Sequence, residues 1–326
     1  MNPAFSVIFL TTLIGAAQGL FLALFTAQSY ALFKLLPVQD SQSFYASGSA
    51  LVLALSALGL ISSFFHLGRP ERAWRSAAMW RTSWLSREVI VLPAFMGIVF
   101  MYGVAHFAGW KPTIATLPYG IVIDATLVLG VLGMLLAFAL FVCTAMIYAC
   151  LPFLREWHSP LTVSNYTLLG GASGFTLAAA FAASAAPALT HFFAAWALIL
   201  TLLAWISRSA SLMRNSRLRP KSTVQTAIGI KHPRIVQKSA GFLGGSFNTR
   251  EFFHGKSVAA LRAVKCGFLL TVFALAPFLL AIELSGTGAR LLPLAFAVQY
   301  LGMLAERCFF FAQANHSHNV YYQDIT

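Results

Sequence analysis

The chain has 326 residues, of which 59% are hydrophobic and 10% are charged. Soluble domains carry roughly 25% charged residues, so this composition excludes an ordinary soluble protein and indicates a polytopic membrane protein. The formal net charge of +13 would suggest a nucleic-acid partner in a soluble chain. Here the basic residues lie beside apolar segments, so we expect them to set membrane orientation and to contact the lipid bilayer, with no nucleic acid bound.

Taken in chain order, eight apolar stretches are long enough to span a bilayer, which requires about 20 residues each. They are residues 5–36, 46–65, 86–107, 121–148, 165–185, 190–206, 258–283 and 291–312. We therefore predict an all-α polytopic membrane protein with eight transmembrane helices in a bundle. Small residues in the first and fifth stretches (GAA at 15–17 and GGASG at 170–174) predict close contacts between helices.

The pattern divides the chain into three parts. Residues 1–206 hold six helices and a polar loop at 62–91, residues 207–257 form a basic connection, and residues 258–326 hold two helices and a tail. The connection of about 50 residues is far longer than the usual 4–6. Aromatic side chains in its second half favour docking of a soluble subunit over the alternative, a solvated tether on anionic lipid. The docking residues predicted there are Phe247, Arg250, Phe252 and Phe253.

The basic residues are distributed unequally between the two sides of the predicted bundle. Of the 22 Lys and Arg residues, 19 fall on one side, and only Lys34, Lys111 and Arg290 fall on the other. Because cytoplasmic loops are enriched in Lys and Arg, we predict that both termini, the 62–91 loop and the 207–257 connection are cytoplasmic.

The 62–91 loop carries the candidate chemistry. It places His66 at the end of the second apolar stretch and Glu88 just inside the third. An ionisable residue inside a membrane segment is a functional candidate, although a salt bridge from Glu88 to Arg87 or Arg72 is the alternative. Reduction of a quinone needs a hydrogen-bond donor and proton carriers, which histidine and glutamate supply. We predict a quinone site with His66 and Glu88 as catalytic residues and further contacts from Gly68, Arg72, Ser86, Arg87 and Tyr148.

Metal centres are not expected on this chain. The chain has four cysteines, and none of them forms a C-x-x-C pair: Cys143, Cys150, Cys266 and Cys308. We interpret them as small core residues. A bis-histidine haem needs two histidines at matching depth, whereas His66 falls at one face and His106 and His191 at the other. Any iron–sulfur clusters therefore belong to a partner.

The motif His-Leu-Gly-x-Pro-x-Arg-Ala at 66–73, followed by Leu-Ser-x-Glu at 85–88, resembles the membrane-anchor subunit of dimethyl sulfoxide reductase, the DmsC family. The late pair Glu306-Arg307, which we expect to pair with neighbouring helices or with the His66 loop, also fits. The resemblance implies a complex in the bacterial cytoplasmic (inner) membrane. Its partners would be a molybdopterin catalytic subunit and a ferredoxin-like iron–sulfur subunit, which the Lys and Arg distribution puts on the cytoplasmic side. The haem-free anchor would exchange electrons with quinone (ubiquinone or menaquinone) at the residues matching His66 and Glu88. Arg69, Arg75 and Arg81 are expected to face the partner's acidic surface.

The long basic connection and the tail FFFAQANHSHNVYYQ look like the anchor of the quinone-linked sulfite dehydrogenase, a subgroup of that family. This resemblance implies sulfite oxidation to sulfate by the complex. One alternative is the anchor of a dimethyl sulfoxide or related S- or N-oxide reductase that oxidises menaquinol. Other classes are a pure structural anchor and a transporter built on broken helices, for which the 170–174 glycine cluster is the only hint.

Overall fold

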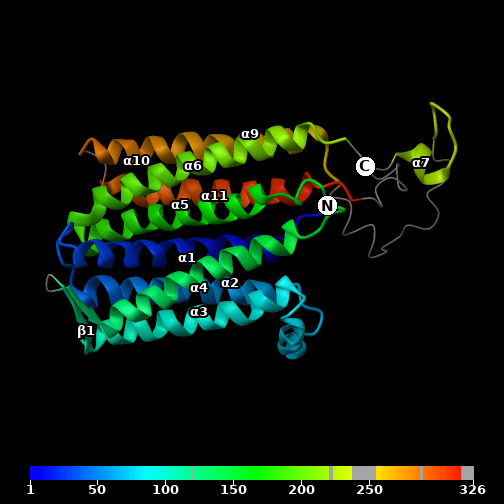
Figure 1. The fold of residues 1–326 in the computed structure, drawn as a ribbon. Helices are drawn as coiled ribbons and strands as arrows, with labels where there is room; N and C mark the ends of the chain where they lie inside the picture. The colour runs from blue at the N-terminus through cyan, green and yellow to red at the C-terminus, as the bar shows by residue number, and fades with distance from the viewer. Residues whose placement is uncertain (119–120, 220–222, 237–254, 287–288, 317–326) are drawn as a thin grey trace.

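The structure is a computed structural model that describes residues 1–118, 121–219, 223–236, 255–286 and 289–316. Within these residues, eight helical segments are long and apolar enough to cross a membrane. They lie side by side in an elongated bundle (Figure 1). The predicted fold of eight spanning helices is confirmed.

The spanning helices form two groups of four. The first group comprises α1 (Phe5–Leu32), α2 (Ser47–Phe64, preceded by the π-helical turn η1, Ser41–Ala46), α3 (Trp84–Phe107) and α4 (Ala125–Ala149). The second comprises α5 (Pro160–Ala185), α6 (Thr190–Ser216), the segment α9–η5–α10 (Val258–Leu270, Thr271–Leu275, Ala276–Leu284) and α11 (Leu292–Ala312). Neighbours within each group are in contact, and the groups join where α5 packs on α1 and α4 and where α11 packs on α1.

Helices α1 and α5 touch through their backbones, with no side chains between them. A Cβ atom added to Gly174 would lie 2.1 Å from the carbonyl carbon of Gly19, and one added to Gly19 would lie 2.4 Å from the carbonyl oxygen of Gly170. Only residues without a side chain allow this approach. The predicted close packing of both small-residue stretches is confirmed. Because α5 is one continuous helix through this region, the glycines are explained by packing and not by a broken helix of the transporter type.

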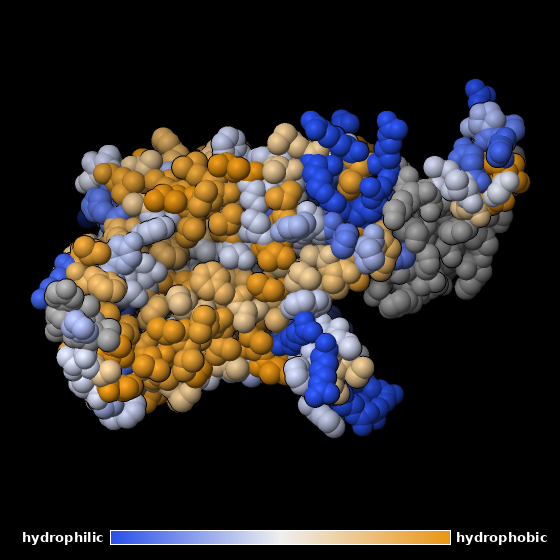
Figure 2. Space-filling model, viewed as in Figure 1, coloured by the Kyte–Doolittle hydropathy of each residue, from blue (hydrophilic) through white to orange (hydrophobic). Residues whose placement is uncertain are grey.

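The two ends of the bundle differ. One end, called the near end below, carries the N-terminus, the 3-10 segment η2 (Pro70–Met79, cyan), the end of α6 and the start of α9 (Figure 1). There the amino group of Met1 donates to the carbonyl of Ala314, 2.8 Å away. The opposite, far end carries a β-hairpin. Hydrophobic residues cover the visible side of the bundle between the ends, and hydrophilic residues gather at the ends (Figure 2). Which end faces the cytoplasm stays a prediction.

The far-end hairpin was not predicted. Residues 121–124, assigned to the fourth span from sequence, form strand β2 (Ile121–Asp124), which pairs antiparallel with β1 (Thr113–Leu117). Helix α4 begins only at Ala125, where the Asp124 carboxylate accepts from the backbone N–H of Leu127 at 2.9 Å. A short apolar run such as IVI does not distinguish a strand from the start of a helix by periodicity.

Two other boundaries differ because capping and polar residues extend helices beyond their apolar part. Helix α5 begins at Pro160 and not at 165, since Ser159 caps it and proline fits the first helical position. Helix α6 continues past the predicted end at 206 to Ser216, so Arg208 is helical and buried. The seventh span contains the π-helical turn η5, which ends two residues before Pro277, and the missing N–H of this proline interrupts the helical ladder.

The glycine contact makes a stability prediction. Gly174→Ala should lower the free energy of unfolding by about 1–3 kcal/mol, because the added methyl group must push the α1 backbone away. Gly171→Ala is the matched control on the same helix, since its Cβ would meet only a Leu200 methyl at 3.7 Å. Thermal unfolding of the detergent-solubilised protein measures both. Equal behaviour of the two variants would contradict the close contact.

Candidate functional site

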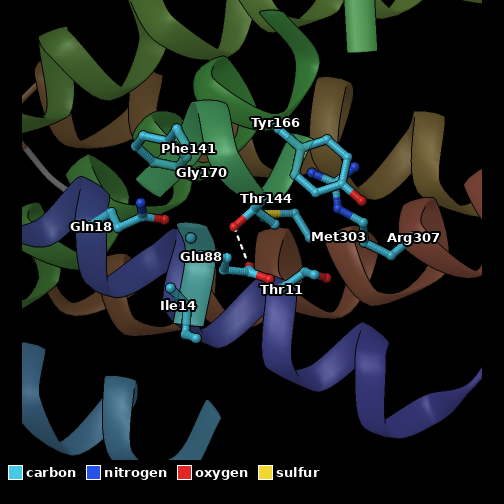
Figure 3. Close-up of a pocket in the computed structure, with 11 residues that line it drawn as sticks. Thr11, Ile14, Gln18, Glu88, Phe141, Thr144, Tyr166, Gly170, Met303 and Arg307 are labelled. Atoms are coloured by element: carbon cyan, nitrogen blue, oxygen red, sulfur yellow. Dashed lines mark hydrogen bonds between the residues drawn. The ribbon is translucent and has the colours of Figure 1, made fainter. Parts of the chain in front are cut away.

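A small polar cavity lies where the two helix groups meet, toward the near end (Figure 3). Side chains and glycines from α1, α3, α4, α5 and α11 line it: Thr11, Ile14, Gly15, Gln18, Glu88, Phe141, Thr144, Tyr166, Gly170, Met303 and Arg307. About 10 Å³ is open to the centre of a water-sized sphere, which is room for about one water molecule. The cavity is therefore a water-sized polar site inside the membrane-spanning bundle.

Glu88 is the acidic group of this cavity. It follows Trp84 by four residues, which places it about 6 Å along α3 from the near end of that helix. Its side chain is buried, with 8% exposed, and its carboxylate accepts a hydrogen bond from the Thr144 hydroxyl of α4. Ser83 caps α3 one turn earlier by accepting from the Ser86 N–H at 3.4 Å. The cap and the α4 contact fix Glu88 toward the interior.

The alternative partners of Glu88 are engaged elsewhere. Arg72 lies 3.9 Å from the carboxylate of Glu71. The Arg87 guanidinium donates to the carbonyls of Trp80 at 2.9 Å and Arg81 at 2.8 Å. Among the described residues, Glu88 forms no ion pair. A buried carboxyl group held by one hydroxyl is suited to hold and release a proton.

A buried cluster of three charges borders the cavity. The Glu306 carboxylate lies 2.8 Å from Nε of Arg208 and 3.1 Å from Nη1 of Arg307, and all three side chains are almost fully buried. The Arg307 guanidinium lies 3.6 Å from the centroid of the Tyr166 ring. This arrangement confirms the expected pairing of Glu306-Arg307 with a neighbouring helix. Sequence reasoning missed Arg208, which it had assigned to the basic connection.

Two buried donors border the cavity, the Tyr166 hydroxyl and Nε of Arg307. Nε of Arg307 has no hydrogen-bond partner among the described residues, and the Tyr166 hydroxyl lies beside that of Tyr148. Buried polar groups are nearly always hydrogen-bonded, to protein or to ordered water. Their remaining hydrogen-bonding capacity suits the cavity to a water molecule, and Figure 3 shows that Tyr166, Arg307 and Glu88 line it together. Carboxyl, hydroxyl and guanidinium groups thus converge on a site that can bind water and a proton.

The other predicted quinone residues are divided between this cavity and the surface. Tyr148 stacks on Tyr166 with the ring centroids 5.8 Å apart, so it supports the cavity wall from behind. Ser86 is buried near the start of α3. His66, Gly68 and Arg72 are exposed in the loop after α2. His66 does not line the cavity. Partial desolvation lowers the pKa of the His66 imidazole.

Comparison with known proteins identifies the family. Residues 1–305 match the family described as DMSO reductase anchor subunit (DmsC). The chain belongs to the DmsC family. A sulfite dehydrogenase subunit from Allochromatium vinosum is 56% identical to it over 325 residues, which cover 100% of both chains.

In this DmsC-family anchor, the arginines expected to dock a partner are displayed at the near end. Arg69, Arg75 and Arg81 are exposed, and the latter two lie over the rings of Trp74 and Trp80, 5.5 and 5.2 Å from the ring centroids. Stacking on tryptophan limits the motion of these side chains while leaving their charges in solvent. The remaining predicted docking residues, Phe247, Arg250, Phe252 and Phe253, lie outside the described residues.

A separate apolar groove lies between α1, α4, α5 and α6 of the DmsC-family bundle, deeper than the cavity. It offers about 270 Å³ and is walled by Leu22, Phe25, Thr26, Met134, Phe138, Thr167, Leu168, Gly171, Phe175, Trp196 and Leu200. Phe141, one turn along α4 from Phe138, lines the cavity instead. The groove suits an acyl or isoprenoid chain because its walls are almost entirely hydrocarbon.

At the near end, removing the charge of a buried carboxylate should lower the free energy of unfolding more than removing the charge of an exposed one. Glu306→Gln leaves Arg208 and Arg307 buried without a counter-charge and should lower the free energy of unfolding by about 3–5 kcal/mol. Glu71→Gln removes an exposed carboxylate and should cost at most about 1 kcal/mol. Thermal unfolding and the yield of folded protein in membranes measure both. A Glu306→Gln protein as stable as Glu71→Gln would show that the cluster is not needed for folding.

Proposed function

We propose that this chain is the quinone-reactive membrane anchor of a sulfite dehydrogenase complex. The buried carboxyl group of Glu88, which lines one cavity with Tyr166 and the unpartnered Nε of Arg307, supports the quinone part of the proposal. Similarity along the full length to the sulfite dehydrogenase subunit from A. vinosum supports the choice of substrate. The net reaction is sulfite plus water plus quinone giving sulfate plus quinol. Two electrons leave the partner subunits, and two protons must reach the quinone.

The cavity itself does not fit a quinone ring. Its volume of about 10 Å³ is far below the roughly 150 Å³ of a protein cavity that holds benzene. We therefore assign the cavity to a proton and a water molecule. A bound quinone would supply the electron acceptor outside it, at the near end of α3. His66 would hydrogen-bond its carbonyl there, with the remaining contacts from Gly68, Arg72, Ser86 and Arg87.

Glu88 would deliver protons from the interior side of that position. The Thr144 hydroxyl orients the carboxyl group, and the Arg307 guanidinium and Tyr166 hydroxyl would hold the water that exchanges protons with it. Proton carriers of this kind act best when their pKa is adjusted by burial and neighbours. The nearby apolar groove would accommodate the isoprenoid chain.

The partners would bind at the near end. Arg69, Arg75 and Arg81 present positive charge there for an acidic surface of a ferredoxin-like iron–sulfur subunit, and the 207–257 connection would add contacts. A molybdopterin subunit would bind to that subunit. The positive-inside rule puts this end on the cytoplasmic side of the bacterial inner membrane, so electrons would pass from cluster to quinone without crossing the bilayer.

Two substitutions test the separate roles of His66 and Glu88 in the intact complex. Glu88→Gln keeps the shape of the side chain but removes its titrating group, so sulfite-to-quinone turnover should fall by at least about tenfold and change its pH dependence. His66→Ala should abolish quinone-linked turnover. In both variants the soluble subunits should stay bound and should still reduce an artificial dye with sulfite.

Glu283→Gln is the matched control, since Glu283 is also a buried membrane carboxyl group, with 3% exposed, but lies near the far end of α10. It should leave quinone turnover unchanged. Normal quinone kinetics in both test variants would contradict the proposal. Loss of the soluble subunits from both would instead assign His66 and Glu88 to assembly.

A further inference from the structure

A second polar pocket lies at the far end of the bundle, distant from the proposed quinone site. It offers about 380 Å³ between the end of α1, the segment after it, η1, the end of α3 and the start of α4. Its lining consists of Gln28, Ala31, Leu32, Lys34, Val38, Gln39, Tyr45, His106, Lys111, Val122, Asp124, Thr126 and Leu127. We call this the far-end pocket. Nothing in the proposed electron or proton transfer uses it.

The wall of the far-end pocket contains a buried, unpartnered nitrogen. His106 has 1% of its surface exposed. Its ring is held between Tyr45 and Tyr102, with centroids 4.6 and 4.5 Å away, and Nδ1 lies 3.3 Å from the Ser41 hydroxyl. Nε2 has no hydrogen-bond partner among the described residues. In the tautomer in which Nδ1 accepts from Ser41, Nε2 is an N–H donor available to a ligand.

The floor of the pocket is fixed by a chain of hydrogen bonds. Tyr102 donates to Gln28 at 2.8 Å, Gln28 donates to Thr126 at 2.8 Å, and Thr126 donates to Asp124 at 2.7 Å. Asp124 also caps α4 by accepting from the N–H of Leu127. Both bonds reach Oδ1 of Asp124, which fixes the orientation of this carboxylate in the pocket wall.

The charge of the pocket favours an anion. Lys34 and Lys111 line it, and both are exposed. Among the lining residues these two cations face one carboxylate, that of Asp124. Asp40 lies outside the lining and accepts from the N–H of Ser43 at 2.6 Å. Flexible ammonium groups bind phosphate as point charges. A neutral imidazole N–H adds a directional donor.

The rim of the pocket is apolar and faces outward. Val38 is 82% exposed and Val122 43% exposed, and Leu32 and Leu127 also contribute to the lining. This depth, at the end of the spanning helices, is the level at which lipid headgroups lie. An apolar rim beside two lysines therefore matches a ligand with a phosphate and hydrocarbon chains, which free phosphate does not have.

We propose that the far-end pocket binds the phosphate of an anionic phospholipid from the leaflet opposite the η2 loop. Lys34, Lys111 and the His106 Nε2–H group would bind the phosphate oxygens, and the apolar rim would contact the first part of the acyl chains. The bound lipid would connect the end of α1, η1, α3 and the start of α4. The proposal does not depend on the quinone site.

Lipid binding by the full-length chain in nanodiscs or detergent tests this proposal, measured by native mass spectrometry with phosphatidylglycerol, phosphatidylcholine or inorganic phosphate. Phosphatidylglycerol should bind specifically, and Lys34→Gln combined with Lys111→Gln should weaken it by about tenfold or more. His106→Phe keeps the aromatic packing and removes the N–H, and should also weaken binding. Arg290→Gln is the control, since Arg290 is a far-end cation in η6 (Ala289–Leu291) outside the pocket.

Unchanged phosphatidylglycerol binding in the Lys34→Gln/Lys111→Gln variant would overturn the proposal. So would equal binding of phosphatidylcholine, or an equal loss in Arg290→Gln, which would indicate only a general effect of surface charge. Occupancy by inorganic phosphate that matches that of the lipid would assign the pocket to a free anion instead.

Discussion

The backbone contact between α1 and α5 is the constraint on which the rest of this bundle depends. Gly19 and Gly174 bring the two helices together without intervening side chains, and this contact joins the two groups of four helices. The water-sized cavity lies along the same junction, toward the near end, with Gly15 and Gly170 in its wall. A wider separation of α1 and α5 would open this cavity and remove Glu88 and Tyr166 from a common site. Packing of small residues therefore determines the chemistry available at the junction.

Charge within the junction is balanced only in part. Glu306 neutralises one of its two arginine neighbours, so Arg307 brings excess positive charge to a cavity whose acidic member is Glu88. Burial makes these groups sensitive to each other because the low dielectric strengthens their interaction. Glu88 is buried inside the bundle, whereas His66 is exposed in the loop at the near end. The arrangement suits the proposed division of roles, with proton transfer inside the bundle and headgroup binding and partner docking at its near end.

The sequence was sufficient for the features that depend on local composition. Apolar length predicted the eight spans, small-residue stretches predicted close helix contacts without naming the partners, and Glu88 stood out as an ionisable residue in an apolar run. It was insufficient where distant residues meet. Arg208 begins a basic stretch of the kind found in loops, yet an ion pair with Glu306 of α11 holds it inside the bundle. Tyr166 carries no motif, and its importance comes from its place beside Arg307. The β-hairpin was missed because a three-residue apolar run next to a span has no distinct period.

We expect Glu88 to exchange a proton during reduction of quinone by the complex. Infrared difference spectra of the intact complex, sulfite-reduced minus oxidised, report protonation changes of carboxyl groups directly. A carboxyl C=O band should change on reduction in the wild type, be lost in Glu88→Gln and persist in Glu283→Gln. A band that is unaltered in Glu88→Gln, in a complex that still reduces quinone, would contradict proton exchange by Glu88.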